Sequence, residues 1–343
     1  MSVTDTNTNP PAPAFSADEL RRIELTTAVR ATDALPKVEG AGDVVVDGGQ
    51  RVQTMHNGVR VVADGYYGAW MTEIIRRLHG HHEPQEELAF DAVARRVAQT
   101  SDAPVMIELG SYWSYYSLWL SALMPSTRCI CVEPDAPHLE VGRRNFALND
   151  RDATFVHAAV GSPHGATMRM RAESDGAHHQ TPVVTLDGLM RDHGLTNVDV
   201  LLSDVQGAET EMLRGAAELV RGGRIRFLIV STHHHTVSGD PLTHQRCLAT
   251  LCEHGAHILA DHSVLESCSG DGLIVACTRA EDADLEIPMP IVRARESLFG
   301  DPEYELARAM RPTAYPRRVA GRLVDRLAQG ATRWPSRRTR NQR

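Results

Sequence analysis

The sequence predicts an α/β fold in which helices cover both faces of a mostly parallel sheet of seven strands. Three observations support this prediction. From residue 105 to residue 278, short apolar runs alternate with longer runs that have helical spacing. The last two apolar runs are joined by a segment too short for a helical crossover, so we expect an antiparallel hairpin at one edge of the sheet. Glycine or polar residues follow several strand-like runs, at the edge where such sheets bind ligands.

The expected elements follow one another in regular alternation. We expect strands at residues 105–109, 129–133, 154–157, 199–203, 225–231, 256–260 and 273–277. We expect helices between them at residues 114–124, 136–147, 185–193, 207–220 and 243–253. A further helix, with Pro84 at its first position, is expected to precede the first strand.

Four regions are expected along the chain. Residues 1–40 are rich in Thr, Pro, Ala and Asp, and we expect them to be mostly disordered. Residues 41–84 are expected to form a small accessory element, with a β-meander followed by a short helix. Residues 85–280 are expected to form the core domain, and residues 281–343 an extension with an Arg-rich tail.

The charge of the chain is distributed unevenly. Its net charge is −8 over 343 residues, although residues 308–343 contain eleven Arg and a single acid, Asp325. An acidic body is not expected to bind nucleic acid, so residues 312–343 are the candidate for contact with an anionic membrane. No run is long enough to span a bilayer, and the polar start lacks the features of a secretory signal. We expect a cytoplasmic protein, with peripheral membrane contact left open.

Two strand ends suggest a nucleotide-like ligand. Gly110 follows the first expected strand, where the absence of a side chain lets the backbone approach a ligand closely. Glu133 ends the next strand, 23 residues later, near the spacing at which an acid accepts hydrogen bonds from ribose hydroxyls. The alternatives are an ordinary turn at Gly110 and a solvated loop acid at Glu133.

Two further strand ends carry polar side chains. Asp204 and Gln206 follow the fourth expected strand and should face the ligand crevice, although Asp204 could instead cap the following helix. Three adjacent His, at 233–235, end the fifth strand. Neighbouring residues of an extended chain point to opposite faces, so these three cannot all ligate one metal ion; one of them could act as a general base. The His-rich segment 79–83 is interpreted as a surface turn. His178 and His179 are a weaker candidate of the same kind as the three His at 233–235.

Together these motifs resemble the FkbM-type family of S-adenosylmethionine-dependent O-methyltransferases. The resemblance covers about residues 85–278. The matching segments are Met106 to Ser117, Val132-Glu-Pro, Asn145 to Asn149, Thr185-Leu-Asp187 and Asp204 to Ala216, of which the last is the most specific. The resemblance implies a Rossmann-like class I methyltransferase fold and S-adenosylmethionine as cofactor.

The resemblance also implies roles for individual residues. Glu133 would hold the ribose hydroxyls, Ala159 would lie near the adenine, and Asp204 would lie near the transferred methyl group. The remaining cofactor-binding candidates lie in or just after the glycine turn: Glu108, Gly110, Ser111, Tyr112 and Ser117. The chain departs from the family pattern at Ser114, which replaces a second glycine, and at Leu202, Gln206 and Ser231, which replace a Lys and two Glu.

These departures leave the catalytic base open. Direct methyl transfer requires that the acceptor hydroxyl is aligned and loses its proton while water is excluded. We expect His233 or His234 to be the base, with Asp204 orienting it. Proton removal could also be helped by a divalent ion such as Mg²⁺, for which Asp204 and His233 are the candidate ligands.

The acceptor is expected to be a small molecule or glycan. Tyr66, Tyr67 and Trp70 could form an acceptor lid within the accessory element and stack on a sugar, or they could be its hydrophobic core. One alternative function is an NAD-dependent oxidoreductase. A loop that binds the diphosphate of NAD needs further glycines close to the first, but no glycine follows Gly110 before Gly142. The other is a non-catalytic protein that acts at membranes through its basic tail.

Overall fold

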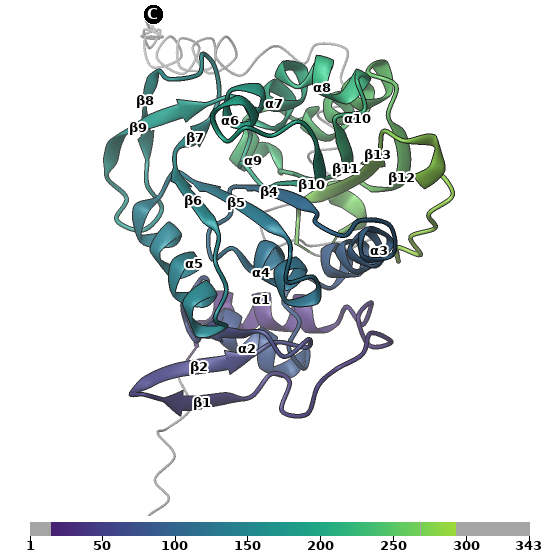
Figure 1. The fold of residues 1–343 in the computed structure, drawn as a ribbon. Helices are drawn as coiled ribbons and strands as arrows, with labels where there is room; N and C mark the ends of the chain where they lie inside the picture. The colour runs from purple at the N-terminus through teal and green to yellow at the C-terminus, as the bar shows by residue number, and fades with distance from the viewer. Residues whose placement is uncertain (1–14, 268, 293–343) are drawn as a thin grey trace, which may run out of the picture.

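The computed structural model describes residues 15–267 and 269–292. A seven-stranded sheet crosses the molecule (Figure 1). Its strands, in spatial order, are β12 (His257–His262), β13 (Gly272–Cys277), β11 (Ile225–Thr232), β10 (Val198–Ser203), β4 (Val105–Leu109), β5 (Arg128–Glu133) and β6 (Thr154–His157). All neighbours pair in parallel except β13, which is antiparallel to both β11 and β12. The predicted fold class, including the edge hairpin, is confirmed, and every predicted strand is present to within about two residues.

Helices cover both faces of the sheet, as predicted (Figure 1). One face is covered by α3 (Pro84–Thr100), α4 (Tyr115–Leu123) and α5 (Ala136–Leu148). The other is covered by α6 (Leu186–Asp192), α7 (Glu209–Gly215), α8 (Ala217–Arg221) and α10 (Thr243–Glu253). Within β4, Met106 packs in the first layer and Ile107 in the second, because successive strand residues point to opposite faces.

One predicted helix is interrupted. The sequence pattern predicts a single helix over residues 207–220, but the structure has two shorter ones, α7 and α8, that meet at Ala216. Gly215 at the end of α7 weakens helix continuity, because glycine costs about 1 kcal/mol relative to alanine in a helix.

The accessory element has the predicted order of β1 (Val44–Asp47), β2 (Gln50–Thr54), β3 (Arg60–Val62) and α2 (Ala69–Arg77). Side-chain amides of α5 attach it to the core. Asn149 accepts the Arg60 N–H at 2.9 Å and donates to the Arg60 carbonyl at 2.7 Å. Asn145 accepts the Val62 N–H at 2.8 Å. The edge strand β3 is therefore paired by side chains instead of a further strand.

The elements that were not predicted include an N-terminal helix and a small sheet. Helix α1 (Ala17–Thr27) lies in the region expected to be mostly disordered, and the expectation is wrong for this segment. A capping box between Ser16 and Glu19 starts the helix, and Ile23 is fully buried against the accessory element. The second is a small sheet of β7 (Ala159–Val160), β8 (Thr167–Arg171) and β9 (His178–Val184), in which His178 and His179 are exposed.

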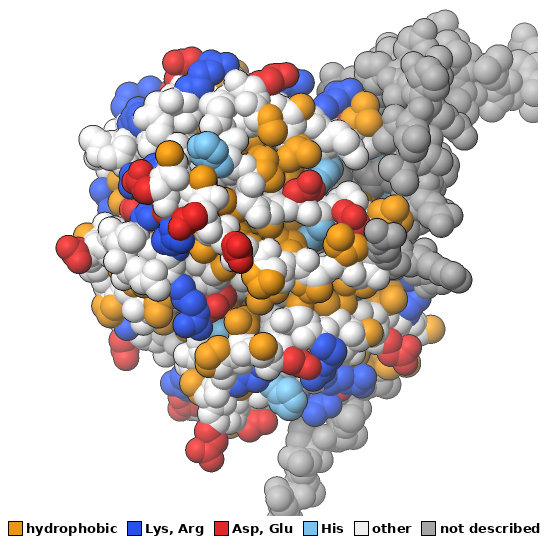
Figure 2. Space-filling model, turned by 90° about the vertical axis from the view of Figure 1, so that its right-hand side faces the viewer, with side chains coloured by type: hydrophobic (Ala, Val, Ile, Leu, Met, Phe, Trp, Pro, Cys, Tyr) orange, Lys and Arg blue, Asp and Glu red, His pale blue; other side chains and the backbone are white. Residues whose placement is uncertain are grey.

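The start of the extension after residue 280 is anchored to the core. Arg226 on β11 forms two hydrogen bonds of 2.7 Å with the buried carboxylate of Asp282. On the face shown in Figure 2, acidic and basic side chains are intermixed around exposed hydrophobic ones. Among the described residues, none of the helices combines the length and apolar character needed to cross a bilayer. The basic segment 312–343, proposed for membrane contact, lies outside the described residues, as do residues 1–14.

Candidate active site

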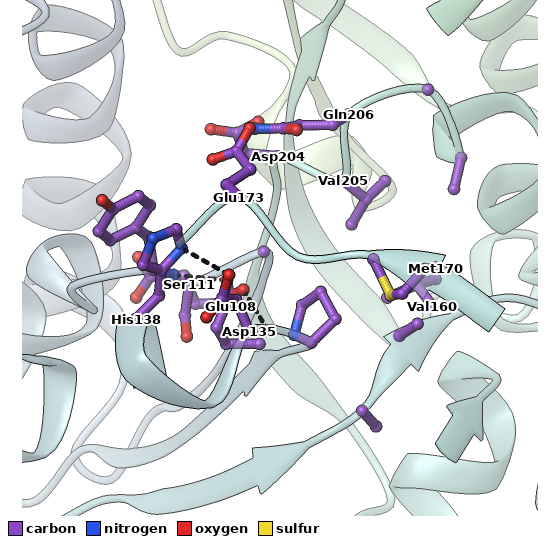
Figure 3. A pocket seen from close by; sticks show the side chains of 18 of the residues that line it. Glu108, Ser111, Asp135, His138, Val160, Met170, Glu173, Asp204, Val205 and Gln206 are labelled. Atoms are coloured by element: carbon purple, nitrogen blue, oxygen red, sulfur yellow. Dashed lines mark hydrogen bonds and ion pairs between the residues drawn. The ribbon is translucent and has the colours of Figure 1, made fainter. Parts of the chain in front are cut away.

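A cavity of about 680 Å³ opens at the carboxyl ends of β4, β5 and β10. The small sheet β7–β9 and the accessory element contribute the remaining walls. Most of the residues singled out from the sequence line it, namely Tyr66, Tyr67, Glu108, Gly110, Ser111, Tyr112, Glu133, Ala159, Asp204 and Gln206. Figure 3 shows Asp204, Gln206 and Glu173 at one end of the cavity and Asp135 and His138 at another.

The glycine turn after β4 is fixed by the neighbouring strand ends. Gly110 has φ +73°, and a Cβ atom on it would lie 1.7 Å from the carbonyl oxygen of Asp204. The N–H groups of Gly110 and Ser111 both donate to the carbonyl of Val132, and the N–H of Asp204 donates to that of Leu109. The glycine is therefore required first by the contact between β4 and β10, and this contact also fixes the position of Asp204.

Glu133 lies at the end of β5 with its carboxylate against the cavity. Its two oxygens accept the N–H groups of Tyr112 at 2.9 Å and Asp135 at 2.8 Å. Burial raises the pKa of Glu133 to about 8, although these two hydrogen bonds oppose the shift. The oxygens of this carboxyl group keep further acceptor capacity toward the cavity, as binding of a diol requires.

The buried Glu133 carboxyl should make the stability of the ligand-free protein depend on pH. The folded protein keeps this proton up to about pH 8, whereas an unfolded chain loses it near 4.5. The folded state therefore binds more protons in this window, and its stability falls as the pH rises, by up to about 1.4 kcal/mol per pH unit. Urea denaturation between pH 5.5 and 7.5 should show a steeper loss for the wild type than for Glu133→Gln; parallel curves would contradict this assignment.

The first turn of α4 positions Glu108. The N–H of Ser117 donates to the Glu108 carboxylate at 2.8 Å, and burial raises the pKa of Glu108 to about 7. Ser117 itself is fully buried and does not line the cavity, so its expected contact with the cofactor is not supported. Ser111 does line the cavity, and its buried hydroxyl has no hydrogen-bond partner among the described residues.

The missing second glycine of the turn has a structural explanation. Ser114 adopts the left-handed conformation, with φ +58° and ψ 36°, that favours glycine. Its side chain does not line the cavity: its Oγ would lie 2.5 Å from a Cβ placed on Gly142 of α5. The substitution therefore leaves the cavity unchanged. Tyr112 forms one wall, where it stacks on His138 with ring centroids 3.5 Å apart.

The predicted base His233 lies behind the cavity wall, between two carboxylates. Its Nε2 contacts Asp204 Oδ1 at 2.9 Å, and its Nδ1 contacts Glu209 Oε1 at 2.6 Å. Burial would lower the pKa of His233, but the carboxylates of Asp271, Asp204 and Glu209 together raise it well above 6.5. Because His233 does not line the cavity and its ring lies between two carboxylates, its predicted role as base is not supported by this geometry.

The other candidates around β11 have structural roles. His234 caps the short helix α9 (His235–Ser238), where its Nδ1 accepts the N–H of Thr236. It does not line the cavity, so its predicted role as base is not supported. Both ring nitrogens of His233 contact carboxylates, so neither is free for a metal ion. Of the two predicted Mg²⁺ ligands, Asp204 lines the cavity and His233 does not. Asp204 does not cap α7, because the residue at that position is Ala208.

The aromatic residues of the accessory element divide into two groups. Tyr66 and Tyr67 line the cavity, and Tyr66 stacks on Trp113 with ring centroids 4.5 Å apart. Trp70 does not line the cavity but packs beneath the guanidinium of Arg22 on α1, 5.5 Å from its ring centre. Of the three residues proposed as an acceptor lid, Tyr66 and Tyr67 lie at the cavity and Trp70 does not.

The segment 79–83 is not a simple surface turn, as the sequence interpretation had it. His81 and His82 are buried, and both contact the buried carboxylate of Glu87 in the first turn of α3. This arrangement brings Glu83 and Glu86 to the cavity wall, a position that the sequence analysis missed. Pro84 marks the start of this helix in the sequence, but it does not indicate where the acids of the first turn point.

Comparison with known proteins agrees with this geometry. Residues 91–258 match the model of the methyltransferase FkbM domain family. No curated protein matches the chain. The confirmed fold is the Rossmann-like class I methyltransferase fold that the resemblance implied.

Several solved methyltransferases match part of the chain at low sequence identity and low TM-score. Precorrin-6y C5,15-methyltransferase from Geobacter metallireducens is 16% identical, with 54% of this chain and 85% of that chain covered and a TM-score of 0.35. Magnesium protoporphyrin IX methyltransferase from Synechocystis PCC 6803, with bound S-adenosylmethionine, is 13% identical, with 56% and 78% covered and a TM-score of 0.35. TrmK from M. capricolum, with bound S-adenosylhomocysteine, is 10% identical, with 56% and 74% covered and a TM-score of 0.33. Through residues 91–258, the chain belongs to the FkbM family of S-adenosylmethionine-dependent methyltransferases.

Proposed function

We propose that this protein is an O-methyltransferase that uses S-adenosylmethionine to methylate a hydroxyl group of a small-molecule or glycan acceptor. The observation that carries the proposal is the position of Asp204, whose carboxylate lines the cavity while a buried His233 holds its Oδ1. A carboxylate fixed in this way presents its second oxygen to a hydroxyl donor. No cavity-facing histidine competes with it for this role among the residues at the β10 and β11 ends.

The residues present fit the cofactor. Ser111 has a buried hydroxyl at the cavity without a partner among the described residues, and Glu133 presents a carboxyl group at the ribose-binding position of this fold. We assign Ser111, Glu133 and Ala159 to cofactor binding, with Gly110 shaping the turn. S-adenosylmethionine, when bound, supplies the electrophilic methyl group.

The catalytic task of the chain is then to align the hydroxyl and take its proton. Asp204 Oδ2 accepts the hydroxyl proton of the acceptor, while His233 keeps Oδ1 paired and Glu209 keeps His233 oriented. Tyr66, Tyr67 and Tyr112 form an aromatic wall that excludes water from this end and offers flat surfaces to a sugar ring. His233 is thus a positioning residue in this mechanism.

The role of His233 gives a separate prediction. Its replacement by Gln leaves donors for one carboxylate instead of two, so Asp204 loses its fixed orientation. We expect kcat to fall by about 10- to 100-fold, with little change in the KM for S-adenosylmethionine. Steady-state kinetics of His233→Gln test this, with His79→Gln, an exposed histidine on another segment, as the matched control. Wild-type kcat in His233→Gln would exclude the positioning role.

The reaction itself is tested by a metabolite screen with labelled S-adenosylmethionine, run with and without Mg²⁺. Products are identified by mass and by NMR assignment of the methylated atom. Methyl transfer to oxygen supports the proposal, whereas transfer only to nitrogen or carbon would contradict it. A strict requirement for Mg²⁺ would add a metal-assisted step at Asp204.

A further inference from the structure

A second, smaller cavity of about 50 Å³ lies against the acceptor end of the main cavity. The two cavities share four residues, His82, Glu83, Glu86 and Asp204, so they meet at one wall. His262, the last residue of β12, and Asp271, the residue before β13, line only the smaller one. This small cavity is therefore adjacent to the carboxylate that we assign to proton transfer.

Acidic side chains dominate the small cavity, whose described lining residues include Glu83, Glu86, Asp204 and Asp271 but no Lys or Arg. The histidines beside it are already engaged, since His82 pairs with Glu87 and Glu83, and His233 with two other acids. Glu86 and Asp271 make no ion pair with any side chain in residues 15–267 and 269–292. Burial, followed by repulsion from neighbouring acids, raises the pKa of Glu86 well above 4.5. Burial also raises the pKa of Asp271, to about 7.

His262 provides an independent sign of a ligand. Its side chain is 2% exposed, lines the small cavity, and has no hydrogen-bond partner for either ring nitrogen among the described residues. Burial lowers the pKa of His262 to about 4, so the ring is neutral and has one nitrogen that accepts a hydrogen bond. A buried imidazole with no partner costs free energy unless a ligand group satisfies it.

We propose that the acceptor carries a protonated amine, and that Glu83, Glu86, Asp271 and His262 bind this ammonium group in the small cavity. The inference rests on the proposed function. An ammonium group has three N–H donors and no acceptor, which matches a wall made of carboxylates and a neutral imidazole. In the larger cavity, Arg171 is the only Lys or Arg among the described lining residues, so an anionic acceptor is disfavoured.

The spacing of the acids favours an ammonium group over a metal ion. Among the described residues, the only group of three or more His, Cys, Asp or Glu whose ligand atoms all lie within 4.8 Å of one another is His56, His81 and Glu87. The carboxylates of the small cavity are therefore farther apart than the oxygen ligands of a bound divalent ion, which lie about 2.0–2.6 Å from it. Longer N–H···O contacts allow the wider spacing.

The test compares two matched probes on the protein saturated with S-adenosylhomocysteine. The probes are trans-2-aminocyclohexanol and trans-cyclohexane-1,2-diol, which share a ring and a hydroxyl but differ in the amine. NMR titration of the wild type should give about tenfold tighter binding of the amino alcohol. The preference should be lost in Glu86→Gln/Asp271→Asn and kept in Glu211→Gln, which removes a charge from the outer rim of the main cavity.

The outcomes separate this inference from the proposed function. Equal binding of the two probes, or binding of neither, contradicts the ammonium site. A tenfold loss of S-adenosylhomocysteine affinity in the double variant would assign the acids to the cofactor, and Mn²⁺ binding that requires them would assign the site to a metal; each overturns the inference alone. Failure of the wild type to bind S-adenosylhomocysteine would overturn the proposed function. Unchanged S-adenosylhomocysteine binding also shows that the double variant is folded.

Discussion

Replacement of Asp204 by Asn should lower methyl transfer by about a thousandfold, while the affinity for S-adenosylhomocysteine changes little. The amide keeps the size of the side chain but cannot take the proton of the acceptor hydroxyl. It also places an uncharged group against the imidazolium of His233, 2.9 Å away in the wild type. The measurement is single-turnover transfer from labelled S-adenosylmethionine, together with calorimetry.

The control for this variant is Asp102→Asn, which makes the same chemical change at an exposed site before β4, at the opposite edge of the sheet. It should keep wild-type turnover. Transfer by Asp204→Asn at the wild-type rate would show that another group removes the proton, and the mechanism proposed above would then be wrong.

Gly110→Ala should unfold or severely destabilise the cofactor site. An added Cβ would lie 1.7 Å from the carbonyl oxygen of Asp204, so the contact between the ends of β4 and β10 must open. The cost includes both this clash and the left-handed backbone at φ +73°, and we expect a loss of about 3 kcal/mol or more in the free energy of unfolding. Binding of S-adenosylhomocysteine should be lost with it.

Gly194→Ala separates the two contributions. Gly194 also has a left-handed backbone, with φ +63°, but a Cβ there would meet no atom within 4 Å. This variant should cost only about 1 kcal/mol, which is the backbone strain alone. Urea denaturation of both variants measures the difference, and equal costs would show that the contact with Asp204 is not what requires Gly110.

The sheet could be predicted from sequence because its strands are short apolar runs separated by helices, so local pattern and global fold agree. The small β7–β9 sheet could not. Its strands β8 and β9 are mostly exposed and polar, and they lack the apolar pattern that marks a buried strand. Helix α1 was missed because the composition of the whole region obscured a local capping box at Ser16 and Glu19.

In the candidate site, prediction succeeded where a single strand end determines the position of a residue. Gly110, Glu133 and Asp204 follow directly from the parallel sheet, whose carboxyl ends share one edge. The surroundings of His233 could not be predicted, because they depend on Glu209, which comes from another element and contacts the second ring nitrogen. A residue pattern along one strand does not contain that information.

The acids of the small cavity could not be grouped from the sequence either, because they are far apart along the chain. Glu83 and Glu86 precede the core sheet, whereas Asp271 lies nearly two hundred residues later in the edge hairpin. Their proximity results from the tertiary fold, which brings the first turn of α3 and the residue before β13 to one small cavity, so no spacing in the sequence indicates it. Their mutual repulsion is visible only once the fold is known.

The central claim is that the cavity at the ends of β4, β5 and β10 binds S-adenosylmethionine for methyl transfer. Calorimetric titration of the wild type with S-adenosylhomocysteine and, separately, with NAD tests it most directly. The claim predicts one bound S-adenosylhomocysteine per chain and no binding of NAD, because the turn at Gly110 lacks the further glycines of a diphosphate loop. Binding of NAD without binding of S-adenosylhomocysteine would contradict it.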